Sequence, residues 1–101
     1  MAIVQVLDKQ FETYIQHTAI AERVAAMAVQ LNEDYAGLNP LFLGILNGSF
    51  MFAADLFRSI TIPAEISFIK LASYKGTTST GNIITAIGLE ENLTDKHVII
   101  V

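Results

Sequence analysis

Residues 41–58 of this 101-residue chain change abruptly from the pattern of a buried strand to that of a helix. Residues 41–46, LFLGIL, form a short apolar run of the kind found in strands that are covered on both faces. Asn47, Gly48 and Ser49 interrupt this run. Apolar residues then recur at helical spacing, at Phe50, Ala53, Ala54 and Phe57. The segment therefore predicts a strand, a tight turn and a helix.

The predicted turn has the chemistry of an anion site. The first N–H groups of a helix have no intrahelical acceptor, and the helix dipole places partial positive charge at the same end. Gly48 lets a ligand approach the main chain, while Ser49 can cap the helix or donate its hydroxyl. At the carboxyl end of a strand in an α/β sheet, such a turn can hold a phosphate. The pattern alone is weak evidence, since most such junctions only turn the chain.

The rest of the chain alternates between strand and helix patterns. Strands are predicted over residues 3–7, 65–73, 83–87 and 97–101, and a helix runs from an N-cap at Thr18 to about residue 36. Residues 8–18 are polar and are expected to form a loop or a helical turn. Residues 73–82, SYKGTTSTGN, are small or polar and are expected to form a long mobile loop. This order predicts one α/β domain with a parallel central sheet and flanking helices.

Composition excludes several classes of function. The absence of cysteine rules out disulfides, thiol catalysis and cysteine metal sites. The net charge of −4 argues against a general nucleic-acid binder. No apolar run reaches the roughly 18–20 residues of a membrane span, and the first residues lack the basic region of a secretory signal. We therefore expect a cytoplasmic protein that binds neither nucleic acid nor membrane.

Residues 97–101, HVIIV, form a continuously apolar strand. Such a strand normally lies inside a parallel sheet and needs further structure to cover it. We therefore expect residues 1–101 to be the amino-terminal portion of a single domain, whose sheet is truncated after a central strand. The uncovered strand is expected to drive assembly into a homo-oligomer.

Three blocks of the sequence match one known family in content and spacing. LFLGILNGSFMFAADL, then EISFIKLASYKGTTSTGNI, then HVIIV resemble the amino-terminal half of the hypoxanthine (hypoxanthine/guanine) phosphoribosyltransferases. The resemblance implies a type I phosphoribosyltransferase-like, Rossmann-like α/β fold. It also implies a purine-salvage enzyme that transfers the 5-phosphoribosyl group from 5-phosphoribosyl 1-pyrophosphate to hypoxanthine or guanine. The products are IMP or GMP and pyrophosphate, and the cofactor is Mg²⁺.

The resemblance assigns the turn to the family's pyrophosphate-binding loop. The loop corresponds to Leu46, Asn47, Gly48 and Ser49, whose backbone amides hold the anion, and it often contains a cis peptide bond. Many relatives carry Lys or Arg at the position of Asn47. This chain therefore lacks a positive charge there and has only main-chain and amide donors.

The resemblance assigns the catalytic lid to the segment that contains Ser73 and Tyr74. In relatives this pair closes over the reacting centre and excludes water. Lys70 and Lys75 flank the pair; they either assist with the charge of a phosphate or, as is more common for lysine, are solvated at the surface. The catalytic carboxylate, the residues that recognise the purine and a metal-binding aspartate follow the HVIIV strand in the family. The resemblance therefore implies that these 101 residues alone are inactive and hold no metal ligand.

Two classes of function stay open from the sequence. The first is the phosphoribosyltransferase, with a preference for hypoxanthine, guanine or xanthine left undecided. The second is a non-catalytic binding or regulatory module on the same scaffold, which the small number of Lys and Arg residues disfavours. Two adjacent carboxylate pairs are expected to be solvated, namely Glu33 with Asp34 and Glu90 with Glu91.

Overall fold

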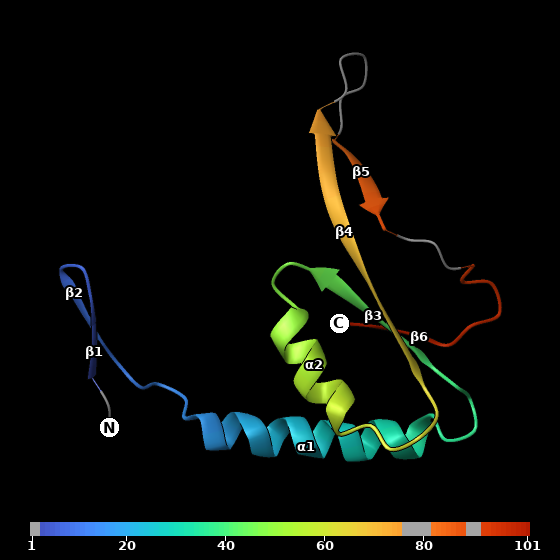
Figure 1. Ribbon diagram of the computed structural model, residues 1–101, viewed down its shortest axis with the longest axis horizontal. Helices are drawn as coiled ribbons and strands as arrows, with labels where there is room; N and C mark the ends of the chain where they lie inside the picture. Colours follow the sequence, from blue (N-terminus) through green and yellow to red (C-terminus); the bar gives the residue numbers. More distant parts are fainter. Residues whose placement is uncertain (1–2, 76–81, 89–91) are drawn as a thin grey trace.

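The computed structural model describes residues 3–75, 82–88 and 92–101, which form two sheets and two helices (Figure 1). The elements in order are β1 (Ile3–Val6), β2 (Lys9–Glu12), α1 (His17–Asp34), β3 (Leu41–Leu46), α2 (Phe50–Arg58), β4 (Glu65–Lys75), β5 (Asn82–Ile87) and β6 (Val98–Ile100). Neither helix in these ranges has the length and apolar character needed to cross a membrane.

A four-stranded sheet in the order β5-β4-β3-β6 forms the centre of the protein. β3 pairs in parallel with both β4 and β6, while β5 adds to β4 in the antiparallel direction. Leu41, Phe42 and Leu43 of β3 are at most 4% exposed, as expected for a strand covered on both faces. The predicted α/β fold is confirmed, with one antiparallel strand at the edge of its parallel sheet.

Both helices pack on one face of this sheet. The buried core joins Val24 and Ala28 of α1, Phe42 of β3 and Leu56 of α2. The ring of Phe42 meets the ring of Phe57 edge to face, with 5.5 Å between the ring centroids. Burial of a Leu or Phe side chain contributes about 1.5–3 kcal/mol. This core therefore fixes α2 against β3, the strand that leads into it.

The buried face of α2 agrees with the predicted one at Ala53 and Phe57 and differs from it elsewhere. The predicted stripe contains Phe50, Ala53, Ala54 and Phe57, but the structure buries Ala53 and Leu56 and leaves Phe50 56% exposed. The helix is apolar around most of its circumference. Sequence spacing therefore gives the period of the stripe but does not select which side of α2 meets the sheet.

The amino-terminal residues form a β-hairpin that lies apart from the four-stranded sheet (Figure 1). The predicted strand over residues 3–7 is present as β1, but the loop or helical turn predicted over residues 8–18 is wrong over Lys9–Glu12, which form β2, and holds for residues 13–16. β2 pairs with β1, and Val6 lies opposite Lys9, so that Leu7 and Asp8 make the turn. The backbone of Leu7 has φ 54°, a conformation uncommon for leucine, so the residue at this position does not indicate a tight turn.

α1 begins slightly before its predicted start. Thr18 is not the N-cap, because that position is taken by Gln16, which forms no side-chain capping bond. The backbone carbonyl of Gln16 instead accepts a hydrogen bond from the N–H of Ala19 at 3.1 Å. The helix ends at Asp34, within two residues of the prediction, and Gly37 follows with φ 78°.

Candidate functional site

The turn between β3 and α2 lies at the carboxyl end of a central strand (Figure 1). The peptide bond between Leu46 and Asn47 is cis, as the resemblance implies for this loop. The carbonyl of Asn47 accepts a hydrogen bond from the N–H of Phe50 at 3.3 Å. The carbonyl of Ser49 accepts one from Ala53 at 2.8 Å, which opens the helix. The strand, turn and helix are therefore continuous, as predicted.

Three consecutive backbone donors in this turn are unpaired. The N–H groups of Asn47, Gly48 and Ser49 donate to no acceptor among the residues that the structure describes. Asn47 and Gly48 are exposed, and an added Cβ on Gly48 would meet no described atom within 4 Å. The donors lie at the positive end of the α2 dipole. The turn can therefore offer several N–H groups to one anion.

The Ser49 side chain does not cap α2, so this part of the prediction is wrong. Ser49 occupies the N-cap position with helical dihedral angles (φ −86°, ψ −10°) and forms no capping bond. Its hydroxyl donates instead to the carbonyl of Ile45 at 2.6 Å. Serine often bonds the carbonyl four residues earlier when its backbone is helical. The bond ties the start of α2 back to the end of β3.

Gly44 belongs to this site, although the sequence motifs did not mark it. It is buried in β3 and lies opposite Phe68 of β4. A Cβ on Gly44 would lie 2.6 Å and 2.7 Å from two ring carbons of Phe68, and 3.3 Å from Oγ of Ser49. Glycine therefore allows both side chains to approach the strand. A lone glycine inside an aliphatic strand is the sequence feature that could have indicated this close approach.

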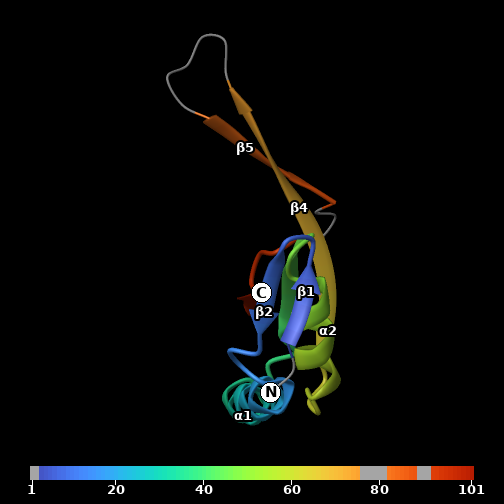
Figure 2. The same ribbon diagram turned by 90° about the vertical axis from the view of Figure 1, so that its left-hand side faces the viewer.

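Ser73 and Tyr74, the predicted lid pair, lie near the end of β4. Their backbones pair with Ile84 and Ile83 of β5, and the β4–β5 ribbon projects away from the helices (Figure 2). The mobile loop predicted over residues 73–82 is therefore wrong at its two ends, where cross-strand pairing with Ile-rich β5 favours strand. Residues 76–81 lie outside the described part, as do the side chains of the lid pair. Ser73 is three residues, about 10 Å, further along β4 than the end of β3.

Lys70 lies beside the turn. It is opposite Leu46 in the parallel ladder, so both side chains leave the same face of the sheet. This is also the face of Phe42, on which α2 packs. The Lys70 side chain is exposed and forms no ion pair with any carboxylate in the described ranges. A positive charge is therefore available next to a turn in which Asn47 carries none.

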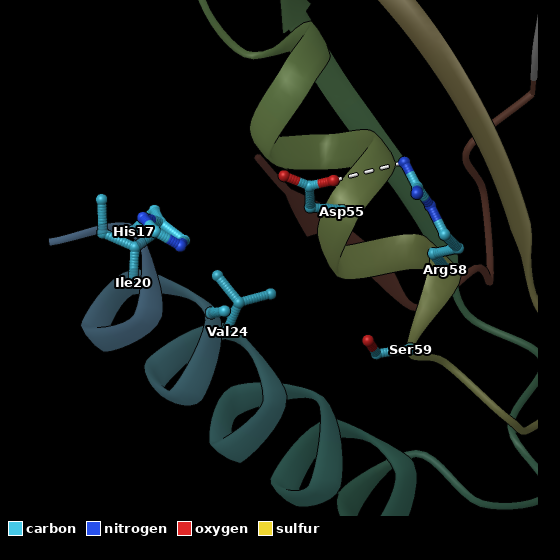
Figure 3. Close-up of a pocket in the computed structure, with 7 residues that line it drawn as sticks. His17, Ile20, Val24, Asp55, Arg58 and Ser59 are labelled. Carbon is cyan, nitrogen blue, oxygen red and sulfur yellow. Dashed lines mark hydrogen bonds and ion pairs between the residues drawn. The ribbon is translucent and has the colours of Figure 1, made fainter.

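One hollow lies away from this turn. It has a volume of about 420 Å³ and opens between α1 and the carboxyl end of α2 (Figure 3). Its lining residues are His17, Ile20, Ala21, Val24, Asp55, Arg58 and Ser59. Asp55 and Arg58 form an ion pair of 3.3 Å across its rim, and both side chains are more than half exposed. The hollow contains none of the predicted site residues.

The described residues contain no cluster of metal-binding side chains. Nowhere in the described ranges do three or more His, Asp or Glu side chains gather in a group that could hold a metal. Glu33 and Asp34 are exposed at the end of α1. The pair Glu90 and Glu91 lies outside the described residues.

Comparisons with known proteins agree on one family. The family model described as a phosphoribosyl transferase domain matches residues 10–101. The chain is 36% identical to the hypoxanthine-guanine phosphoribosyltransferase of Streptococcus pneumoniae over 88 residues, which are 86% of this chain and 49% of that protein. It is 34% identical to the hypoxanthine-guanine-xanthine phosphoribosyltransferase of Tritrichomonas foetus over 82 residues, 81% of this chain and 45% of that one.

The structural comparison agrees with these sequence matches. The crystal structure of a hypoxanthine phosphoribosyltransferase from Staphylococcus aureus matches with a TM-score of 0.75 and 34% sequence identity. The match covers 88% of this chain and 49% of that one. The chain thus spans about half the length of the curated relatives that it matches.

Proposed function

Because the chain belongs to the phosphoribosyl transferase family, we propose that the protein is a purine-salvage enzyme. It transfers the 5-phosphoribosyl group from 5-phosphoribosyl 1-pyrophosphate to hypoxanthine or guanine, giving IMP or GMP and pyrophosphate. The names of its relatives support these purines, and the Tritrichomonas relative keeps xanthine as a third. The observation that carries the proposal is the turn over residues 46–49, in which Asn47 and Gly48 are exposed and the N–H groups of Asn47, Gly48 and Ser49 have no acceptor among the described residues.

In this proposal the turn binds the diphosphate of the cosubstrate and the pyrophosphate product. Leu46, Asn47, Gly48 and Ser49 form the binding loop, and the N–H groups of the last three donate to phosphate oxygens. The α2 dipole favours the anion, typically by about 0.3–1 kcal/mol for a charge at an exposed helix terminus. Lys70, beside the turn, supplies the charge that Asn47 does not.

We assign the lid to Ser73 and Tyr74 at the end of β4. β4 continues past the carboxyl end of β3, which is the end that leads into the binding turn. A lid there can close over the reacting centre and keep water from a transition state with oxocarbenium character. Its support is this position on the β4–β5 ribbon (Figure 2) together with the family match.

Mg²⁺ enters the proposal with the cosubstrate. Magnesium in phosphate-transfer sites is commonly held by substrate phosphate oxygens and only one or two carboxylates. The described residues supply no ligand cluster, so no residue of this chain is assigned to the metal. The acidic motif that carries the family's catalytic carboxylate, and that follows the HVIIV strand in the family, is also not among these 101 residues. We therefore expect the chain by itself to bind pyrophosphate without catalysing transfer.

Two measurements test the proposal. Titration of the ¹⁵N-labelled chain with magnesium pyrophosphate should shift the amide resonances of Asn47, Gly48 and Ser49, while those of β2 in the separate hairpin stay unchanged. Amide resonances of the turn that do not respond would refute the binding loop. The second measurement is nucleotide formation by the full-length protein from 5-phosphoribosyl 1-pyrophosphate and each purine. A protein that carries the acidic motif and binds the cosubstrate without turnover would be the non-catalytic module instead.

We also propose that the 101-residue chain, studied by itself, self-associates through β6. This strand forms one edge of the four-stranded sheet, and Ile100 is 72% exposed. A free apolar edge offers backbone and side chains to a second strand. Sedimentation velocity over a wide range of concentrations should show reversible association, and a monomer throughout would contradict the idea.

A further inference from the structure

The Ser49 hydroxyl faces into the fold and has no proton left for an anion. A serine hydroxyl carries one proton, and that of Ser49 is donated to the carbonyl of Ile45 at 2.6 Å. What remains on Oγ are lone pairs, which do not attract a phosphate oxygen. Contacts between the turn and an anion therefore have to come from its backbone N–H groups and the side-chain amide of Asn47, and the role of the Ser49 side chain has to be a different one.

The acceptor of this bond is held firmly by the sheet. The N–H of Ile45 donates to the carbonyl of Val101 at 3.0 Å, and the N–H of Val101 donates to the carbonyl of Leu43 at 2.9 Å. The carbonyl of Ile45 therefore has a fixed position at the end of β3. The hydrogen bond from Ser49 to this carbonyl therefore holds the first turn of α2 in place relative to β3.

The space around Ser49 is equally restricted. Its Oγ lies 3.3 Å from the place where a Cβ on Gly44 would stand, and two carbons of the Phe68 ring lie 2.6 Å and 2.7 Å from the same point. Gly44 and Phe68 are paired across β3 and β4, so the ladder holds their backbones in place. We call Gly44, Ser49 and Phe68 the seat of the turn. The seat leaves the Ser49 side chain little choice of orientation.

We propose that Ser49 is a positioning residue, whose bond to Ile45 on the seat orients the backbone amides of Asn47 and Gly48 for diphosphate binding. The inference rests on the proposed function and adds how its site is held. Only three residues separate β3 from α2, so fixing both ends of the turn restricts its middle. Donors that are already oriented lose less entropy when the ligand binds.

The experiment compares three substitutions at Ser49 with a control. S49A removes the hydroxyl, S49C keeps its approximate size with a weak donor, and S49T keeps the hydroxyl. The control is S59A, at the other end of α2. For each variant, ¹⁵N relaxation gives the backbone order parameters of the free protein. Calorimetry with magnesium pyrophosphate gives Kd, and thermal unfolding reports overall stability.

We expect S49A and S49C to lower the order parameters of Asn47 and Gly48 from about 0.85 toward 0.6, with those in the middle of α2 unchanged. Their Kd for pyrophosphate should rise about three- to tenfold, the effect of one net hydrogen bond. S49T should restore both quantities, and S59A should leave both as in the unsubstituted chain. Should S49A fail to fold, S49C carries the same test with less change in volume.

The outcomes separate this inference from the proposed function. Weaker binding by S49A with unchanged order parameters would mean that the hydroxyl meets the anion directly, which overturns the positioning role. Unchanged binding and unchanged order parameters would overturn it as well. If the unsubstituted chain does not bind pyrophosphate, the proposed function fails. The order parameters of the free variants would still show whether Ser49 orients the turn.

Discussion

Replacing Gly44 with alanine tests how tightly the seat is packed. The new Cβ would lie 2.6 Å and 2.7 Å from carbons of the Phe68 ring, well inside ordinary contact distance. The ring must therefore move, and Oγ of Ser49, at 3.3 Å, has no room to compensate. Gly48→Ala is a matched control four residues away, because nothing described lies within 4 Å of its added Cβ.

The two substitutions should differ in their effect on the free energy of unfolding. Overpacking a core by one carbon costs about 1–3 kcal/mol. Gly→Ala also restricts the unfolded chain, which stabilises by about 0.4–1 kcal/mol where the native backbone accepts alanine. Neither Gly44 nor Gly48 has positive φ, so this gain applies to both. The net expectation is a loss of about 1–2 kcal/mol for G44A and no loss for G48A.

Thermal and urea unfolding measure this difference. A change of 1 kcal/mol shifts Tm by about 4–8 °C in a domain of this size, so G44A should lower Tm by roughly 4–16 °C. Because Phe68 is the residue in the way, the combination of G44A with F68L should show a favourable coupling of at least about 0.5 kcal/mol in a double-mutant cycle. Equal stability of G44A and G48A would refute the reasoning, and so would strict additivity with F68L.

Three further predictions concern charge near the turn and the core beneath it. Asn47→Lys should tighten pyrophosphate binding about two- to fivefold, the usual size of an exposed ionic interaction, whereas Asn47→Gln should not; calorimetry decides. Lys70→Gln should weaken pyrophosphate binding by a similar factor that shrinks as salt is added, while Lys9→Gln on the hairpin should have no effect; equal affinities of these two variants would remove Lys70 from the site. Leu56→Ala, at a side chain 2% exposed, should cost about 2–5 kcal/mol in urea unfolding. Leu7→Ala, at a side chain 90% exposed, should stay within about 0.5 kcal/mol, so similar losses for the two would contradict the assigned core.

The strand, turn and helix over residues 41–58 could be predicted from sequence because their patterns are local. An apolar run followed by a helical repeat is visible without knowing any tertiary contact. Local patterns predicted the wrong secondary structure where pairing with another strand determines the backbone conformation. Ser73 and Tyr74 have a loop-like setting in sequence, yet both pair with β5. β2 was also missed, because the turn that precedes it contains Leu7, a residue type that is rare in turns.

The position of the turn was predicted from the sequence, but the contacts that hold it were not. The match of the three sequence blocks located the turn, and small polar residues indicated an anion site there. The direction of the Ser49 hydroxyl could not be foreseen, because capping and bonding to Ile45 are both open to a serine at a helix start. The role of Gly44 depends on Phe68, a neighbour that only the pairing of β3 with β4 brings into contact. Both features are tertiary, and single residue types do not encode them.

A binding site made of backbone N–H donors depends on the residues that set the backbone path. Backbone N–H groups do not depend on side-chain identity, so position 47 can carry the uncharged Asn and still present its donor. Their direction does depend on the backbone path, and that path is set by the close approach of Ser49 and Phe68 to Gly44. Loss of a charge at the turn therefore changes affinity by a small, salt-dependent factor. A single added carbon at Gly44 changes the orientation of the whole turn, and we expect it to weaken diphosphate binding more than any substitution of Asn47 does.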